Sequence, residues 1–440
     1  MKNIGEKQKY LIQKVKRYFR RLSDQNIDIS KSSFCYIPSY GLNPGNTKLT
    51  SWINNKFFNL QNIKIILFHV LAISSYYNYE VFNGNQKNYK NLIISWGRRK
   101  DFKKGNFSDK LLNVSSKSNK NSIFFIIYLD QIKPSFIPKN VVLFCKNGEG
   151  RKIFYLLKVL FKSIFFYRFN LKKLTHYVSS QTIFAEKINE KIDSVVRNNN
   201  ITKVILPYEG QPFQNYLISK LNKKIKTYGI IHSILPALPT NLIKRRGSPE
   251  NIYVSGNEQK KILINLLGWN KNQVTVIRSL RFKKNVSKHI SGSVFLPINL
   301  YNINNIISNF DDFLKTKNKV LLSKLKLRNH PAMKSSEPHN FLIKELKKLI
   351  KKNKFLKANN LKKDYCIFIG PTSSAIEFLE KNFLILHIPI NPVLDIYDNK
   401  IFKSINTLKI KNFFIYRKVN KKNIVLFGKS NYNLNSLKII

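Results

Sequence analysis

Short runs of hydrophobic residues alternate with stretches of helical periodicity through the middle of the chain. The pattern predicts strands in residues 140–148, 201–210 and 225–233, helices in 181–200 and 211–224, and a strand–helix–strand unit in 250–277. The strand segments are continuous hydrophobic runs, which is typical of parallel strands covered on both faces. Repeated strand–helix–strand units indicate a doubly wound α/β domain.

A second pattern of the same kind follows a polar, basic stretch that contains glycine. It predicts strands in residues 294–298, 324–331, 365–370 and 383–390, and helices in 304–317, 335–352 and 373–382. We therefore predict an N-terminal α/β domain in residues 1–280, a linker in 281–293, a C-terminal α/β domain in 294–400 and a tail in 401–440. In such sheets ligands bind beyond the carboxyl ends of the strands. We expect the two domains to face a cleft, with the functional residues just after strands.

The chain is strongly basic. Its 440 residues include 78 Lys and Arg against 23 Asp and Glu, a formal net charge of +55. Such a charge favours anionic partners: nucleic acid, lipid or substrate. The lysines are spread along the whole chain, however, and Asn, Ile, Phe and Tyr are also abundant, as in proteins encoded by AT-rich genomes. We interpret background composition as the main cause, and we expect no nucleic acid because no binding motif or basic arm is present.

The cysteines and the N-terminus favour the cytoplasm. Cys35, Cys145 and Cys366 lie far apart without metal-ligand spacing, and the last two fall in hydrophobic runs typical of core thiols. The N-terminal residues lack the apolar segment of a signal peptide. No hydrophobic run is long enough to predict a transmembrane helix.

One segment is amphipathic enough to suggest contact with a membrane. In residues 151–170, Arg151, Lys158 and Lys162 share one helical face, and most of the other residues are hydrophobic. This pattern is found in helices that lie in a membrane interface. It is found equally in helices that pack an apolar face on a sheet, and we favour that interpretation. Peripheral association with the inner face of an anionic membrane stays an alternative.

The first candidate for chemistry follows the predicted strand that ends near residue 207. Glu209 at a strand end could act as a general base, and Gly210 would let the backbone turn sharply beside a substrate. Gln211 could contact the same ligand. In the structural alternative, Glu209 only interacts with the dipole of the next helix. The residues alone leave both interpretations open.

The second candidate is the sequence Arg328-Asn329-His330-Pro331, also after a strand. An imidazole in this position could bind a phosphate or protonate a leaving group, and Arg328 would add a cation. Pro331 fixes the turn. The alternative is an exposed turn histidine.

The third candidate lies between a strand and a helix in residues 370–374. Hydroxyls and backbone N–H groups at a helix N-terminus bind phosphate, which singles out Thr372, Ser373 and Ser374. The alternative needs no ligand, because Ser374 and Glu377 have the spacing of a capping box.

Three weaker signals complete the set. His232 follows the next predicted strand and could line the same cleft, although a partly buried structural histidine is the more common case. Arg98, Arg99 and Lys100 after another hydrophobic run could meet an anionic acceptor or form a solvated basic turn. The acidic pair at 311–312 falls inside a predicted helix and is interpreted as solvated, so we predict no metal site.

An acidic residue with glycine, a His-Pro pair and a Ser-Ser pair, in this order, resemble the motifs of bacterial sialyltransferases, polysialyltransferases and Kdo transferases. These are two-domain glycosyltransferases of the GT-B type that use CMP-sugars. Teichoic acid glycerophosphotransferases, which use CDP-glycerol, have a similar His-Pro and serine arrangement. The segments "ISWGRRKDF", "YEGQPFQNYL" and "YGIIHS" also resemble a family of surface carbohydrate biosynthesis proteins found among O-antigen and capsule genes. The resemblance covers roughly residues 90–390.

This resemblance implies specific roles. Glu209 would deprotonate the acceptor hydroxyl, His330 would contact the nucleotide phosphate and act as the acid, and Ser373 and Ser374 would hold the same phosphate. The N-terminal domain would take the acceptor and the C-terminal domain the nucleotide, without a metal or other cofactor. The sialyltransferase motif has two acidic residues before the glycine, and here the first is replaced by Tyr208. That departure leaves Glu209 alone in the base role and leaves the identity of the donor open.

The expected function is therefore a metal-independent glycosyltransferase of lipopolysaccharide, O-antigen or capsule biosynthesis. Its partners would be a nucleotide-sugar donor of the CMP-linked class and a glycan or lipid-linked acceptor. Two alternatives stay open. One is a CDP-polyol phosphotransferase of the teichoic acid type, and the other is a non-catalytic partner in the same pathway, which the Tyr208 departure would fit.

Overall fold

The structure is a computed structural model of the chain. It describes residues 3–24, 28–30, 77–83, 88–149, 157, 161, 165, 180–283, 290–297, 300, 303–315, 325–329, 336–352, 364–419, 423–429, 431–437 and 439–440.

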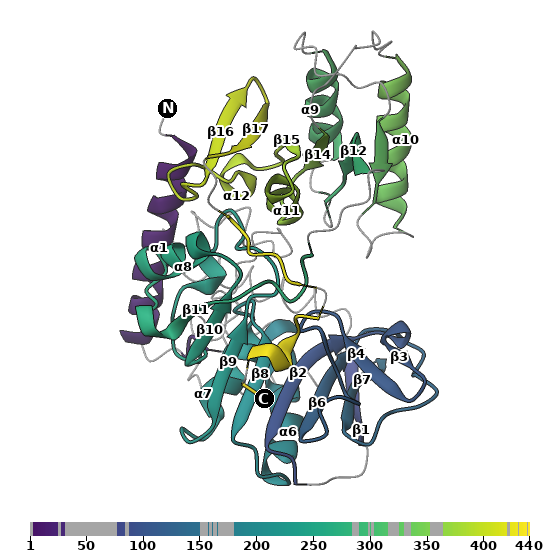
Figure 1. Cartoon of the computed structure of the whole chain (residues 1–440), viewed down its shortest axis with the longest axis vertical. Coiled ribbons are helices and arrows are strands. Elements are labelled where there is room, and N and C mark those ends of the chain that lie inside the picture. The colour runs from purple at the N-terminus through teal and green to yellow at the C-terminus, as the bar shows by residue number, and fades with distance from the viewer. Residues whose placement is uncertain are drawn as a thin grey trace.

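The first domain is built on an eight-stranded sheet with the order β1-β7-β6-β2-β8-β9-β10-β11 (Figure 1). The strands are β1 (Tyr77–Asn83), β2 (Asn91–Gly97), β6 (Ser122–Tyr128), β7 (Val141–Glu149), β8 (Lys203–Pro207), β9 (Lys226–Ile230), β10 (Asn251–Val254) and β11 (Val274–Val276). All neighbouring pairs are parallel except β1 with β7. The carboxyl ends of β2, β6, β8 and β9 therefore lie at one edge of the sheet, as the continuous hydrophobic runs predict.

The two faces of this sheet are covered differently. On one face Leu92 and Phe125 share a core cluster with Ile188 of α6 (Ser180–Arg197) and with Phe213 of α7 (Pro212–Lys220). The cluster also includes residues of α8 (Asn257–Asn265). The opposite face belongs to another cluster, which contains Ile93. Alternate residues of one strand thus enter different cores, because successive side chains point to opposite faces.

A small three-stranded sheet covers part of that opposite face. It consists of β3 (Phe102–Lys103), β4 (Asn106–Asp109) and β5 (Val114–Ser115), and follows the short 3-10 helix η3 (Arg99–Asp101). Phe107 is fully buried against Phe124 of β6, with ring centroids 6.0 Å apart. The hydrophobic pattern does not reveal these strands, because they are short and mostly polar.

The second domain contains a six-stranded sheet with the order β13-β12-β14-β15-β17-β16 (Figure 1). Its strands are β12 (Ser293–Phe295), β13 (Lys326–Arg328), β14 (Tyr365–Ile369), β15 (Leu384–Ile388), β16 (Ile405–Ile410) and β17 (Phe413–Lys418). The helices α9 (Ile303–Lys315) and α10 (Glu337–Lys352) share a core cluster with one face. The other face packs with α11 (Ser374–Glu380). The short helix α12 (Pro392–Asp395) follows β15.

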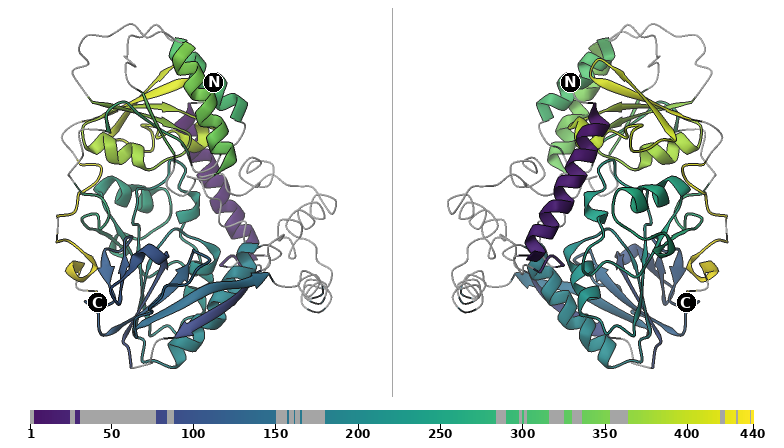
Figure 2. Two further views of the ribbon diagram at one scale, coloured as in Figure 1. Left: turned by 90° about the vertical axis from the view of Figure 1, so that its right-hand side faces the viewer. Right: turned by 90° about the vertical axis from the view of Figure 1, so that its left-hand side faces the viewer.

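Segments from both ends of the chain join the two domains. In α1 (Ile4–Asp24), the fully buried Gln8 donates hydrogen bonds to the carbonyls of Val393 and Ile396, at 2.9 and 2.8 Å. Farther along α1, the Lys16 ammonium lies 3.4 Å from the Leu266 carbonyl of the first domain. Figure 2 shows α1, in purple, running alongside both domains. This helix therefore fixes one domain against the other.

The predicted tail also takes part in both domains. Residues 405–418 form β16 and β17 of the second sheet. The following segment returns to the first domain, where the Leu426 N–H donates to the Ser255 carbonyl at 2.6 Å. Leu434 is fully buried in the core on the β4 side of the first sheet. The C-terminus consequently lies beside the first sheet (Figure 1).

The predicted α/β class with two Rossmann-like domains is confirmed, and Cys145 and Cys366 are buried free thiols, as expected for core residues. Cys35 lies outside the described residues. Most of the amphipathic segment 151–170 lies outside them too; the three described side chains, Leu157, Phe161 and Phe165, are exposed. Within the described part of the chain, none of the helices has the length and hydrophobicity needed to cross a bilayer.

Candidate functional site

Glu209 lies directly beyond the carboxyl end of β8, on a loop fixed by a buried amide. The Gln214 side chain, which is fully buried, accepts hydrogen bonds from the N–H groups of Glu209 and Gln211, at 3.0 and 3.1 Å. Its amide nitrogen donates to the Pro207 carbonyl at 2.7 Å. One side chain from α7 thus satisfies three backbone groups of the turn and fixes its shape.

Gly210 is required by the shape of this turn. Its φ is +70°, and a Cβ atom placed on it would lie 2.1 Å from the Asn241 carbonyl oxygen. The Asn241 amide donates to the Glu209 carbonyl at 2.6 Å, and Arg245 donates to the Gly210 carbonyl at 2.7 Å. The turn is therefore held from the other side by the segment that follows β9, and glycine alone fits there without strain.

The Glu209 carboxylate faces the end of the neighbouring strand β9. It accepts a hydrogen bond of 2.7 Å from the Gln211 amide, and its other oxygen lies 3.6 Å from His232 Nε2. The Glu209 side chain is 35% exposed, so a ligand can reach it, while protein surrounds the rest. Burial raises the pKa of Glu209 above its ordinary value, and the Gln211 hydrogen bond and the charge of Arg281 oppose this shift.

His232 is a neutral imidazole. It is 8% exposed, and burial lowers its pKa to about 3, with a smaller contribution from the charge of Arg281. Its Nδ1 atom has no hydrogen-bond partner among the residues that the structure describes. The histidine is buried, as the structural alternative predicted, but it also lies next to Glu209. An imidazole with a free ring nitrogen at this place can accept or donate one hydrogen bond to a ligand.

Arg281 is a functional candidate that the sequence did not single out. It lies at the start of the predicted linker and is exposed. Its charge opposes the raised pKa of Glu209 and contributes to the lowered pKa of His232. A cation near both groups is suited to an anionic ligand. Nothing in the basic, polar pattern of residues 281–293 distinguishes Arg281 from its neighbours.

The serines of the second domain lie at the start of α11, after β14. Helix α11 begins at Ser374 with Ser373 as its N-cap residue, and the Thr372 hydroxyl accepts a hydrogen bond from the Ser374 N–H at 3.2 Å. Ser373 makes no side-chain capping bond. Glu377 pairs instead with Lys381 at 2.6 Å. The capping box expected between Ser374 and Glu377 is therefore wrong, because the helix begins one residue earlier than that motif requires, with Ser373 and not Ser374 as the N-cap residue.

Arg328 ends β13 and points to a neighbouring strand. Its Nε donates a 2.7 Å hydrogen bond to the Ser293 hydroxyl of β12, which ties two strands together at this edge. His330 and Pro331 lie outside the described residues, so their expected roles stay predictions.

One tyrosine connects the loops that carry the candidates of the two domains. The buried Tyr397 hydroxyl lies 3.2 Å from the Leu235 carbonyl, three residues after His232. It also lies 3.4 Å from the Thr372 carbonyl, one residue before Ser373. The structure therefore brings two loops to the same junction between the domains. One is the His232 loop, residues 231–235 after β9, and the other is the serine loop, residues 370–373 before α11. The cleft predicted there stays a prediction.

Tyr208, the departure from the family motif, points away from Glu209. It is 1% exposed, its hydroxyl donates to the Asn215 side chain at 2.8 Å, and its ring packs edge-on against Trp269. Alternate residues of an extended segment point in opposite directions, so Tyr208 enters the core and Glu209 does not. The tyrosine is a core residue.

Other acidic residues have structural contacts. Asp311 pairs with Lys315 one turn later in α9, and Asp312 accepts a 3.0 Å hydrogen bond from Asn412. No group of three or more metal-ligating side chains occurs within the described ranges.

Comparison with known proteins gives a distant structural likeness. No protein-family profile and no curated protein matches the chain. Among solved structures, UDP-GlcNAc 2-epimerase from Neisseria meningitidis bound to UDP-GlcNAc is similar to 69% of this chain and 83% of its own, with 10% identity and a TM-score of 0.37.

Proposed function

We propose that the protein is a glycosyltransferase that transfers a sugar from a CMP-linked donor to a glycan or lipid-linked acceptor in surface polysaccharide biosynthesis. The observation that carries this proposal is the position of the Glu209 carboxylate on the turn of residues 208–211. A carboxylate with a raised pKa lies beyond a parallel strand, beside a neutral histidine, at the junction of two α/β domains. The resemblance of the ordered motifs to CMP-sugar transferases supplies the donor class.

Glu209 serves as the general base. As the acceptor oxygen forms its bond to the anomeric carbon, the acceptor proton passes to Glu209 and the bond from that carbon to the phosphate oxygen breaks. The electron pair leaves with the nucleotide. A base whose pKa is raised toward the working pH accepts a proton more strongly than an ordinary carboxylate, while staying ionised.

The other candidates act on binding and orientation. The neutral His232 orients the acceptor hydroxyl through a hydrogen bond. Ser373 and Ser374 hold the donor phosphate through their hydroxyls, and His330 contacts the same phosphate and protonates it. The connection of the serine loop to the His232 loop through Tyr397 supports their action on one ligand.

The non-catalytic alternative rested on Tyr208. Because that side chain belongs to the core, its identity does not bear on whether Glu209 can act as a base. The structure offers no observation that favours polyol-phosphate transfer over sugar transfer, and a donor screen separates them.

Replacing Glu209 by Gln tests the proposal. We expect the Glu209→Gln variant to lose about 10²–10⁴-fold in the transfer rate, because the amide cannot accept the proton, while its affinity for the donor is unchanged. The wild-type rate should also fall as the pH drops through the raised pKa of Glu209, because the protonated carboxyl is no base. Rates of sugar transfer over a range of pH give both results.

The matched control is Glu345→Gln, which removes a partly exposed carboxylate of α10 that pairs with Lys348. This variant should transfer at the wild-type rate. Full activity in the Glu209→Gln variant would rule out the base role.

A further inference from the structure

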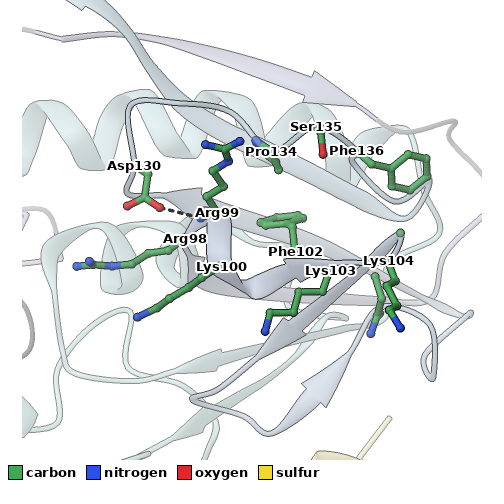
Figure 3. Close-up of a pocket in the computed structure, with 12 residues that line it drawn as sticks. Arg98, Arg99, Lys100, Phe102, Lys103, Lys104, Asp130, Pro134, Ser135 and Phe136 are labelled. Carbon is green, nitrogen blue, oxygen red and sulfur yellow. Dashed lines mark hydrogen bonds between the residues drawn. The ribbon is translucent and has the colours of Figure 1, made fainter.

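A cavity of about 620 Å³ opens at the end of the first sheet where β2 and β6 have their carboxyl ends, which is the same end of the sheet as Glu209. No residue given a role in the proposed reaction lines this cavity. Its walls come from η3 after β2, the β3–β4 hairpin, and the loop after β6 (Figure 3). The charged side chains that line it are the cations Arg98, Arg99, Lys100, Lys103 and Lys104, and the single carboxylate Asp130.

The carboxylates near this cavity already have partners. Asp130 accepts a hydrogen bond of 2.7 Å from the Arg99 backbone N–H, as the dashed line in Figure 3 shows. Asp101 accepts one of 2.9 Å from the Arg98 N–H and pairs with Lys110 at 2.6 Å. Among the described residues, none of the five lining cationic side chains forms an ion pair. The cavity therefore holds an excess of uncompensated positive charge.

Uncompensated charges of one sign in a concave surface attract counter-ions more strongly than the same charges spread over a flat surface. Arginine and lysine side chains bind carboxylate and phosphate oxygens through charge-assisted hydrogen bonds. The cavity also presents aromatic surface: Phe102 lies among the cationic side chains in Figure 3, and Phe136 is 55% exposed. A ligand that carries carboxylate or phosphate groups on a large organic molecule would match both the cations and the aromatic rings.

The register of the sheet places the cavity close to the proposed base. Strands β2 and β8 are parallel neighbours, with Asn91 paired to Lys203 and Ile93 to Ile205. The pairing ends there, and beyond it Trp96 of β2 packs edge-on against Phe213 at the start of α7, with ring centroids 5.7 Å apart. Trp96 lies two residues before Arg98 of the cavity, and Phe213 lies four residues after Glu209. A molecule in the cavity can therefore extend to the Glu209 carboxylate.

We propose that this cavity binds the anionic part of the acceptor, a glycan segment that carries carboxylate or phosphate groups. The inference rests on the proposed function and names its acceptor class. The cations hold the oxyanions of the acceptor, and the chain of sugars runs across the edge of β2 to place a hydroxyl at Glu209.

Binding measurements on the full chain test this assignment. The probes are tetragalacturonate, a tetramer of glycerol phosphate, and neutral maltotetraose as the matched uncharged glycan. The variant changes the three exposed lysines of the cavity together, Lys100→Gln, Lys103→Gln and Lys104→Gln. The control removes the same charge at the opposite edge of the sheet, before and at the start of β9, through Lys223→Gln, Lys224→Gln and Lys226→Gln.

We expect calorimetric titration to show at least tenfold weaker binding of one anionic tetramer to the cavity variant, and less than twofold change for the control. The tetramer that binds more tightly shows whether the acceptor carries carboxylate or phosphate groups. Equal losses in both variants, or equal binding of maltotetraose, would overturn the proposal. So would a ten-nucleotide thymidine strand that binds the cavity more tightly than either tetramer, since the site would then take nucleic acid.

A second readout separates this inference from the proposed function. The Glu209→Gln variant should bind the anionic tetramer as the wild type does, while it loses transfer. Cavity-dependent binding together with full transfer by Glu209→Gln would keep the anion site and refute the base. Loss of transfer by Glu209→Gln without cavity-dependent binding would support the base role and refute the anion site.

Discussion

At the scale of single residues, neighbouring side chains of one turn have unrelated tasks. Tyr208 packs in the core and donates to Asn215, while the next residue, Glu209, is the carboxylate of the candidate site. A motif comparison treats the two positions alike. The direction of each side chain separates them, and it depends on the extended backbone that continues β8.

The Tyr208→Phe variant tests this separation. Removing the hydroxyl leaves a buried amide oxygen of Asn215 without its partner, so we expect the free energy of unfolding to fall by about 1–3 kcal/mol. The transfer rate measured at a temperature where the variant stays folded should not change. Urea denaturation and initial-rate measurements on the same preparation give the two values. A large loss of activity in a stably folded variant would show that Tyr208 acts in the reaction.

The sequence points to Glu209, Gly210 and His232 because each follows a hydrophobic run. It does not point to the residues that fix them. Arg245 binds the Gly210 carbonyl from 35 positions away, and Arg281 lies in a segment with the composition of a linker. Such roles depend on which distant segments the fold brings together, and local periodicity carries no information about that.

At the scale of elements, the parallel strands could be predicted and the small sheet could not. Strands β6, β8 and β14 are nearly continuous hydrophobic runs because both of their faces are buried. Strands β3, β4 and β5 have two to four residues each and lie at the surface of the domain. Their side chains alternate between core and solvent over too short a span to give a period. The basic cavity, formed partly by this sheet, could not be predicted for the same reason.

The turn after β8 gives a prediction at this scale. The Gly210→Ala variant places a methyl group 2.1 Å from the Asn241 carbonyl oxygen at a φ of +70°, so the turn must shift. We expect it to lose about 2–4 kcal/mol of stability, because strain at positive φ adds to a steric clash with backbone.

Gly105 provides the matched comparison for this measurement. It has the same φ, +70°, but an added Cβ would meet only the Phe136 ring, at 3.5 Å. The Gly105→Ala variant should therefore lose only about 1 kcal/mol. Chemical denaturation gives the loss of stability of both variants. Because both glycines have the same φ, the difference between the two losses is the cost of the steric clash at residue 210. Equal losses would show that the contact with Asn241 does not constrain the turn.

At the scale of the whole molecule, the domains are not separate segments of the chain. The largest core cluster contains Leu206 of the first sheet and Phe368 of the second. Helix α1 contacts both domains, and the chain returns to the first domain after β17. The sequence pattern is most informative in the middle of the chain, where β8, β9, β10 and β11 pair in the order in which they occur in the sequence. It cannot assign the two ends, because a terminal strand or helix has the same pattern whichever domain it joins.

The central claim is that the junction between the domains binds a cytidine nucleotide for transfer chemistry. The most direct measurement is the melting temperature of the protein with CMP, CDP, UDP and GDP, since a ligand that binds only the folded state raises it. We predict that CMP raises the melting temperature of the wild type and of Glu209→Gln, and that the rise is lost in Ser373→Ala/Ser374→Ala and in His330→Ala. A rise with UDP or GDP alone would contradict the CMP-linked donor, and no rise with any nucleotide would contradict the transferase account.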